Sequence, residues 1–154
     1  MRLLGIDLGE RRIGLAIADA DGSPARAHST LKRSTPERDA AMLAELVAVN
    51  DIDELVVGLP LEASGIEGVQ ARITREWVTA VATQLQVPIT FRDERLSSHV
   101  AEGRVGPMKR GRSGGPPSRT VRDAHRAKVD REAAAIILQD ELDARASAQA
   151  GRGG

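Results

Sequence analysis

Residues 3–18 read Leu3-Leu4-Gly5-Ile6-Asp7-Leu8-Gly9-Glu10-Arg11-Arg12-Ile13-Gly14-Leu15-Ala16-Ile17-Ala18. Two short apolar segments flank a polar turn, which is the pattern of two neighbouring strands joined by a tight connection. The second segment alternates large and small apolar residues. We therefore expect both of its faces to be covered, with a helix packed closest against the small side. This pair predicts a central hairpin in a layered protein.

Strand and helix patterns alternate along the rest of the chain. Short apolar segments bounded by turn residues or proline predict three more strands, at residues 25–31, 53–60 and 88–96. Four helices are expected: one capped by Ser34, one with Val69, Ile73, Trp77, Val81 and Leu85 on its apolar face, one following Ser97, and one from about His125 to Arg145. The order β-β-β-α-β-α-β-α-α predicts an α/β fold with a mixed five-stranded sheet and helices on both faces.

Length and composition are typical of one domain. A chain of 154 residues can bury one substantial core but not two. We expect a domain over residues 1–145, with a flexible basic loop at 106–123 and a disordered tail at 146–154. The absence of cysteine excludes disulfides and thiolate zinc sites and fits a reducing compartment. No signal peptide or long apolar run is visible, so we expect a soluble cytoplasmic protein.

Charge is unevenly distributed although the formal net charge is zero. Residues 34–68 carry eight acids against Arg38 alone, so contact between that segment and phosphate is disfavoured. Between residues 106 and 128 the balance reverses, and seven basic residues face only Asp123: Lys109, Arg110, Arg112, Arg119, Arg122, Arg126 and Lys128. One basic segment is thus available to a polyanion. With only one tryptophan and one phenylalanine, a base-stacking platform is not expected, and a nucleic acid would be bound through its backbone.

Asp7 is the first candidate site residue. It stands inside an apolar run on an expected central strand, where an isolated charged carboxylate is energetically costly. It can also cap the following turn or pair with Arg11 or Arg12, and these structural roles stay open for Asp7 considered alone. Other carboxylates must decide between the two interpretations.

Two further positions offer such carboxylates. Asp130 shares a helical face with Ala134, Ile137, Leu138 and Leu142, so it should point toward the sheet, although it can also simply favour the positive end of the helix dipole. Asp93 and Glu94 end an expected strand, and strand alternation lets at most one of them face Asp7 easily. Salt bridges to Arg92 or Arg95 are the alternative for this pair.

One shared site explains all of these acids better than three separate structural roles. Clustered carboxylates repel one another, so such a group persists at neutral pH chiefly when divalent cations neutralise it. Oxygen ligands select Mg²⁺ or Mn²⁺, and two such ions can promote hydrolysis of a phosphodiester. The sequence thus predicts a nuclease site at Asp7, Asp130 and one residue of the pair Asp93 and Glu94. The expected phosphate contacts are Arg11, Arg12, Arg95, Lys109, Arg110 and Arg112.

Four motifs together resemble one known family. They are Gly5-Ile6-Asp7-Leu8-Gly9-Glu10-Arg11-Arg12-Ile13-Gly14-Leu15-Ala16, Val56-Val57-Gly58-Leu59-Pro60-Leu61, Asp93-Glu94-Arg95-Leu96-Ser97-Ser98, and Val129-Asp130-Arg131-Glu132-Ala133-Ala134-Ala135-Ile136-Ile137-Leu138-Gln139. In this order and spacing they resemble the YqgF family, also called RuvX.

This resemblance implies an RNase H-like fold related to Holliday junction resolvases. It also implies a metal-dependent nuclease that matures the 5′ end of pre-16S rRNA during ribosome biogenesis. Asp7, Glu94 and Asp130 match the family's catalytic and metal-binding positions, and Asp93 is expected just behind them. The glycine- and proline-rich loop at 106–123 looks longer than the family pattern, so substrate preference is expected to differ.

Two other functions remain open at this stage. The same chemistry can act on branched DNA as a Holliday junction resolvase. A non-catalytic RNA-binding or transcription-associated module can keep the fold without using the acids, although three carboxylates that repel phosphate give such a module no advantage. The sequence does not separate RNA from DNA, exonuclease from endonuclease, or monomer from homodimer.

Overall fold

The structure, a computed structural model, describes residues 1–94, 97–111 and 114–152. Five strands form one sheet: β1 (Arg2–Leu8), β2 (Arg12–Asp19), β3 (Arg26–Lys32), β4 (Glu54–Leu59) and β5 (Ile89–Asp93). Their order is β3-β2-β1-β4-β5, antiparallel among the first three and parallel from β1 to β5. The predicted mixed five-stranded sheet is therefore confirmed, with β1 at its centre.

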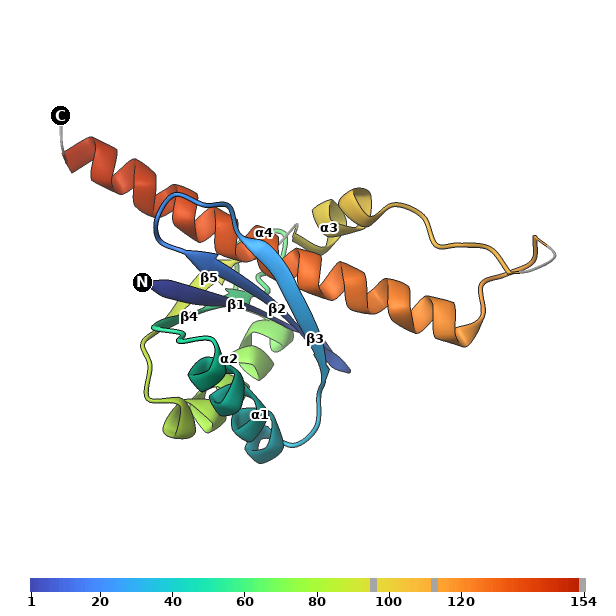
Figure 1. The fold of residues 1–154 in the computed structure, drawn as a ribbon, viewed down its shortest axis with the longest axis horizontal. Helices are drawn as coiled ribbons and strands as arrows, with labels where there is room; N and C mark the ends of the chain where they lie inside the picture. The colour runs from blue at the N-terminus through green and yellow to red at the C-terminus, as the bar shows by residue number, and fades with distance from the viewer. Residues whose placement is uncertain (95–96, 112–113, 153–154) are drawn as a thin grey trace.

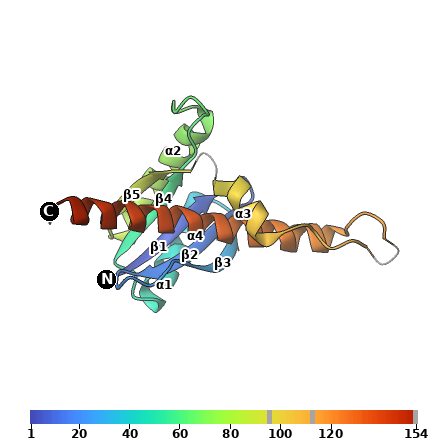
Figure 2. The ribbon, with the colours of Figure 1, turned by 90° about the horizontal axis from the view of Figure 1, so that it is seen from above.

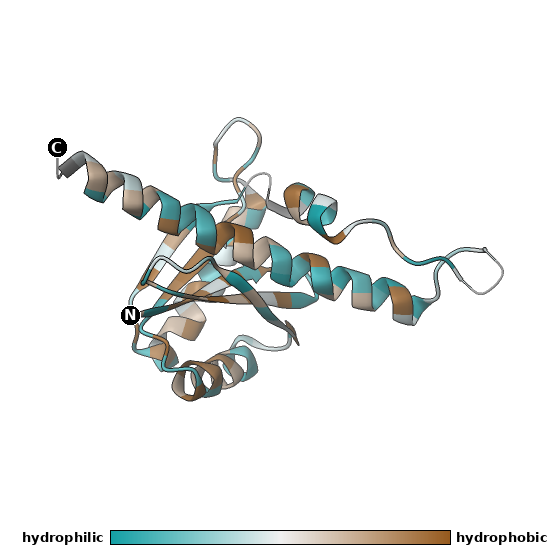
Figure 3. Cartoon of the chain, turned by 45° about the horizontal axis from the view of Figure 1, so that its top comes forward, coloured by the Kyte–Doolittle hydropathy of each residue, from teal (hydrophilic) through white to brown (hydrophobic). Residues whose placement is uncertain are grey.

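The helices cover both faces of this sheet, as expected (Figures 1 and 2). Helices α1 (Pro36–Val49) and α2 (Val69–Leu85) lie on one face, and α4 (Arg119–Arg152) crosses the other with α3 (Ser97–Val105) beside it. Figure 3 shows hydrophobic residues where the middle of α4 passes over the strands. No helix in the described part of the chain has both the length and the apolar character needed to cross a bilayer.

The alternation of large and small residues in β2 sets the distance of each helical layer. Ile13, Leu15 and Ile17 face α1 and α2 and build the larger core with Trp77. The small residues face α4: a Cβ on Gly14 would lie 2.0 Å from the backbone oxygen of Asp130. Only glycine allows α4 to approach the sheet this closely at that point.

Several expected boundaries differ from the observed ones. Thr35, not Ser34, caps α1, because its side chain accepts from the backbone N–H of Arg38. Val69, expected on the apolar face of its helix, is the first residue of α2 and is 64% exposed. The first turn of that helix extends past the core. The strand expected at 88–96 is shorter and ends at Asp93.

Helix α4 begins earlier and ends later than the expected span from His125 to Arg145. Its start at Arg119 is stabilised by Ser118, whose hydroxyl accepts from the backbone N–H of Val121. Residues 119–123, expected to belong to the basic loop, are therefore helical. At the other end the helix continues through residues 146–152, which were expected to be disordered; this alanine-rich segment favours helix.

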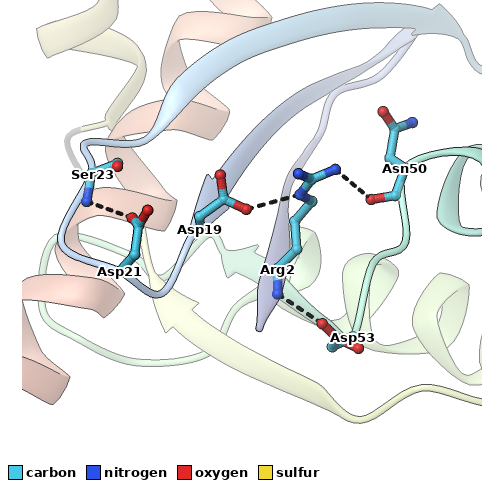
Figure 4. A network of polar contacts seen from close by, with 6 residues as sticks. All are labelled: Arg2, Asp19, Asp21, Ser23, Asn50 and Asp53. Atoms are coloured by element: carbon cyan, nitrogen blue, oxygen red, sulfur yellow. Dashed lines mark hydrogen bonds and ion pairs between the residues drawn. The ribbon is translucent and has the colours of Figure 1, made fainter.

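A polar network centred on Arg2 stabilises the start of β1, at the end of the strand away from Asp7 (Figure 4). The Nε of Arg2 donates to Asp19 over 2.9 Å, and its Nη1 donates to the Asn50 backbone oxygen over 2.9 Å. The backbone N–H of the same residue donates to Asp53 over 2.8 Å. One residue thus joins the start of β1 to the end of β2 and to the segment after α1.

Asp39 is a buried carboxylate with a structural role on the face opposite Asp7. It is 1% exposed and accepts from Trp77 Nε1 at 3.0 Å and from the Ser34 backbone N–H at 2.8 Å. Asp39→Ala should lower the free energy of unfolding by about 3 kcal/mol, because both donors lose a charged acceptor. Asp39→Asn, which keeps one acceptor oxygen, should lose less. Urea unfolding followed by Trp77 fluorescence measures both; equal stability of Asp39→Ala and wild type would contradict this role.

Candidate active site

Asp7 lies near the end of the central strand, on the face covered by α4. It is 6% exposed and pairs across the sheet with Gly14 of β2. On its other side lies Gly58 of β4, one residue beyond the paired residues Ile6 and Val57. The buried carboxylate thus stands between two glycines on the neighbouring strands.

These two glycines make room for the other two carboxylate residues. The backbone of Asp130 lies directly over Gly14, as the 2.0 Å separation of its oxygen from a Cβ there shows. The carboxyl group of Glu94 lies over Gly58, where a Cβ would be 2.9 Å from its Oε2. The backbone N–H of Glu94 also donates to the Leu59 oxygen over 3.2 Å, which fixes this residue beside β4. Residues 7, 94 and 130 therefore gather on one face of the sheet.

The surroundings of Asp7 favour its neutral form. Burial is the largest cause and raises its pKa to about 6; a hydrogen bond with the Glu94 side chain opposes that rise, and the charge of Asp130 adds to it. Two carboxyl groups that hydrogen-bond to each other must share a proton. A divalent cation between them would take the place of that proton at neutral pH.

Asp130 is held by an arginine from the β1–β2 turn. Its Oδ2 accepts from Arg12 Nε at 3.2 Å, and both side chains are about one-fifth exposed. Burial raises the pKa of Asp130, and Arg12 and Arg126 oppose the rise. Two guanidiniums beside this carboxylate thus favour its ionised form, and its hydrogen-bond partner is Arg12 rather than Asp7.

The donor chemistry fits a hard divalent cation, but the ligands are not assembled around one point. Asp7 and Glu94, whose side chains contact each other, offer carboxylate oxygens, which are the ligands that Mg²⁺ and Mn²⁺ prefer. Across residues 1–94, 97–111 and 114–152, however, no three acidic, histidine or cysteine side chains converge as metal ligands. Asp130 would have to turn from Arg12 to complete a three-carboxylate set.

The other predicted site residues differ in their exposure and in their place in the fold. Asp93 is exposed at the end of β5, and Arg11 is exposed in the β1–β2 turn. Lys109 and Arg110 are exposed in the segment after α3, which runs alongside the first turns of α4 and away from the sheet. Arg95 and Arg112 lie outside the described residues.

In the described part of the chain, two cavities are lined in part by Asp130. One, of about 600 Å³, is lined by Arg11 and Arg12 and by three arginines of α4. The other, of about 780 Å³, lies between α3 and α4 and is lined by His99, His125 and Met108. Neither is lined by Lys109 or Arg110.

Sequence reasoning did not identify Arg119, Arg122 and Arg126 as lining residues of the first cavity. Their spacing of three and then four residues would have placed them on one helical face. That signal was missed because residues 106–123 were expected to be loop and the helix to begin only near His125. The observed start at Arg119 aligns the three arginines with Asp130.

Comparison with a solved structure defines the class of fold. The chain resembles a structure described as Thermus thermophilus RuvC in complex with a Holliday junction substrate, with a TM-score of 0.54 and 18% sequence identity. The match covers 94% of this chain and 96% of that one. This likeness, together with the mixed sheet and the helices on both of its faces, identifies the fold as RNase H-like.

Sequence comparison then identifies the family. The family model RuvX, described as Holliday junction resolvase, matches residues 1–144. A protein of Anaeromyxobacter dehalogenans named "Putative pre-16S rRNA nuclease" is 44% identical over 146 residues, covering 95% of this chain and 99% of that protein. A protein of the same name from Chloroflexus aggregans is 41% identical over 143 residues, covering 93% of this chain and 94% of that one. The chain belongs to the RuvX family.

Proposed function

We propose that this protein is a divalent-metal-dependent nuclease whose site is formed by Asp7, Glu94 and Asp130. The observation that carries the proposal is the contact between the buried Asp7 and Glu94 beside Asp130, on a fold shared with a RuvC structure in complex with a Holliday junction substrate. A carboxylate group of this kind destabilises a protein unless a cation or a proton neutralises it. Its presence at the end of the central strand is explained best by metal binding.

Each residue has a distinct part in the proposed chemistry. Asp7 and Glu94 would hold Mg²⁺ or Mn²⁺, and Asp130 would complete the ligand set; two ions fit a site with three carboxylates. The bound metal supplies activation of water and stabilisation of the leaving oxygen. Arg12 keeps Asp130 charged and lies where it can donate to a phosphate oxygen once that carboxylate turns to the metal. Asp93, the last residue of β5, would support Glu94 from the preceding position.

RNA is the proposed substrate, and 5′-end maturation of pre-16S rRNA the proposed process. The support is that relatives above 40% identity over nearly their whole length are named for that precursor. Such a role would place the protein in the cytoplasm with the ribosomal precursors. Branched DNA is the second candidate substrate, favoured by the family description and by the junction in the RuvC complex.

A cleavage assay separates these candidates. Labelled pre-16S rRNA fragments, single-stranded DNA and a four-way DNA junction would each be incubated with the protein in Mg²⁺, Mn²⁺ or EDTA. We expect cuts near the 5′ end of the mature rRNA sequence with either metal and none in EDTA. Cutting of the junction alone would favour the resolvase function. Binding of RNA without cutting under any condition would support a non-catalytic RNA-binding module instead.

A further inference from the structure

The cavity of about 600 Å³ beside Asp130 concentrates positive charge that the folded chain does not neutralise. Five arginines line it, Arg11, Arg12, Arg119, Arg122 and Arg126, together with three acidic residues, Glu10, Asp123 and Asp130. Asp130 is already paired with Arg12. Among the residues that the structure describes, no carboxylate forms a salt bridge with any of the other four arginines. Such a site attracts an anion.

The two walls of the cavity are held in place before any ligand binds. In the β1–β2 turn, the Gly9 backbone N–H donates to the Arg12 oxygen over 2.8 Å, and the Arg33 backbone N–H donates to the Arg11 oxygen over 2.9 Å. The opposite wall is the first part of α4. Because the backbone of both walls is fixed, only the arginine side chains have to be ordered when an anion binds.

The arginines of α4 form a stripe that leads to the candidate active site. Arg119, Arg122 and Arg126 recur at three and four residues, so they lie on one face of the helix, and Asp130 follows one turn later. At about 1.5 Å per residue, the three arginines cover about 10 Å of the helix. A stacked nucleic acid strand advances about 3.4 Å per nucleotide, so the stripe spans about three nucleotides.

We propose that this cavity binds the sugar–phosphate backbone of the substrate strand, with Arg119 and Arg122 contacting the phosphates next to the one that is cut. The inference rests on the proposed nuclease function, because the stripe ends at Asp130. A guanidinium group can donate two parallel hydrogen bonds to the oxygens of a phosphate. Because the chain has only one tryptophan and one phenylalanine, it offers few aromatic side chains on which bases could stack. The first turns of α4 thus position the strand beside Asp130, whereas Lys109 and Arg110 do not line this cavity.

The test measures binding separately from cleavage. Affinity of the full-length protein for a labelled 20-nucleotide RNA is measured by fluorescence anisotropy in EDTA at several salt concentrations, with single-stranded DNA as a second probe. The double variant Arg119→Ala/Arg122→Ala is compared with Lys109→Ala/Arg110→Ala, which removes the same charge from the loop. Alanine favours helix, and removing positive charge near a helix N-terminus is not destabilising, so the α4 variant should fold.

We expect the α4 variant to bind RNA at least about tenfold more weakly at low salt. Its plot of log affinity against log salt should be shallower by about 1.4, the value for two lost phosphate contacts on a single strand. The loop variant should lose clearly less affinity and slope than the α4 variant, and Arg119→Lys/Arg122→Lys should retain most of the binding. Equal losses in the α4 and loop variants, or unchanged binding in the α4 variant, would overturn the proposal.

Together with the cleavage assay described under Proposed function, this binding measurement distinguishes the inference from the proposed function. If wild type binds RNA through Arg119 and Arg122 but shows no metal-dependent cleavage, the strand-binding cavity stands and the nuclease assignment fails. If wild type cleaves and the α4 variant binds and cleaves equally well, only the cavity assignment fails. If wild type binds neither probe, both are overturned.

Discussion

Replacing Asp7 with asparagine should abolish cleavage while making the metal-free protein more stable. Loss of a central metal ligand should lower the cleavage rate by about three orders of magnitude or more, because metal coordination contributes several kcal/mol to transition-state stabilisation. Folding should survive, since asparagine has nearly the same shape and its amide can donate to Glu94. Activity and stability are thus expected to change in opposite directions.

The stability gain follows from the pKa of Asp7. Its value of about 6 in the folded protein lies above the ordinary 3.8, so folding favours the protonated form. The cost of burying the charge is absent below about pH 4, grows between about pH 4 and pH 6, and is complete above that. In EDTA at pH 8, Asp7→Asn should therefore be more stable than wild type by up to about 3 kcal/mol.

Urea unfolding in EDTA at pH 4 and pH 8 measures this difference. The gain of Asp7→Asn over wild type should be present at pH 8 and largely absent at pH 4. Glu45→Gln removes an exposed acid from α1, on the opposite side of the sheet, and should change neither stability nor cleavage. An Asp7→Asn protein that is less stable than wild type at pH 8 would contradict the described environment of Asp7.

Adding one methyl group at Gly14 should damage both fold and activity. A Cβ there would lie 2.0 Å from the Asp130 oxygen and 2.9 Å from the Arg131 nitrogen, and these backbone atoms cannot rotate away as a side chain could. Helix α4 must therefore shift from the sheet. Gly14→Ala should lower the free energy of unfolding by about 3 kcal/mol, in the upper range for overpacking, and should reduce cleavage by moving Asp130.

Gly103→Ala is the matched control for this substitution. Nothing lies within 4 Å of a Cβ at that position in α3, and alanine favours helix over glycine. It should be neutral or slightly stabilising, with wild-type cleavage. Thermal unfolding and the RNA cleavage assay on both variants test the contrast; a Gly14→Ala protein as stable and active as wild type would show that α4 does not pack against β2 at this point.

The layered fold could be predicted because its signals are local and repeated. The alternation from Ile13 to Ala18 indicated a strand covered on both faces, with the helix closest to the small residues. The structure places Gly14, Ala16 and Ala18 under α4, as that pattern predicts. The alternation of large and small residues thus predicted which face of β2 is packed closest by a helix.

Helix ends were less predictable, because neighbouring residues offer similar caps. Ser34 and Thr35 are both good capping residues, and only the backbone conformation makes Thr35 the cap. Similarly, glycines and prolines after Gly106 masked the start of α4 at Arg119. That early start changed the interpretation of the arginines that follow it, from a charged loop to an ordered stripe.

The sequence named Asp7, Glu94 and Asp130 as candidates for one site, but it did not predict how they are arranged. Each carboxylate alone had an ordinary structural explanation, and Asp130 does in fact pair with Arg12. The roles of Gly14 and Gly58 in seating Asp130 and Glu94 depend on which segments cross each strand, and the sequence does not state this. The assignment of all three acids as metal ligands stays a prediction.

Direct titration with Mn²⁺ tests that assignment most directly. Binding would be followed by electron paramagnetic resonance of free Mn²⁺ with wild type, Asp7→Asn, Glu94→Gln and Asp130→Asn, and with Glu45→Gln as control. Wild type and control should bind the ion, and each site variant should lose binding or weaken it at least about tenfold. Wild-type affinity and stoichiometry in all three site variants would contradict a metal site at these carboxylates.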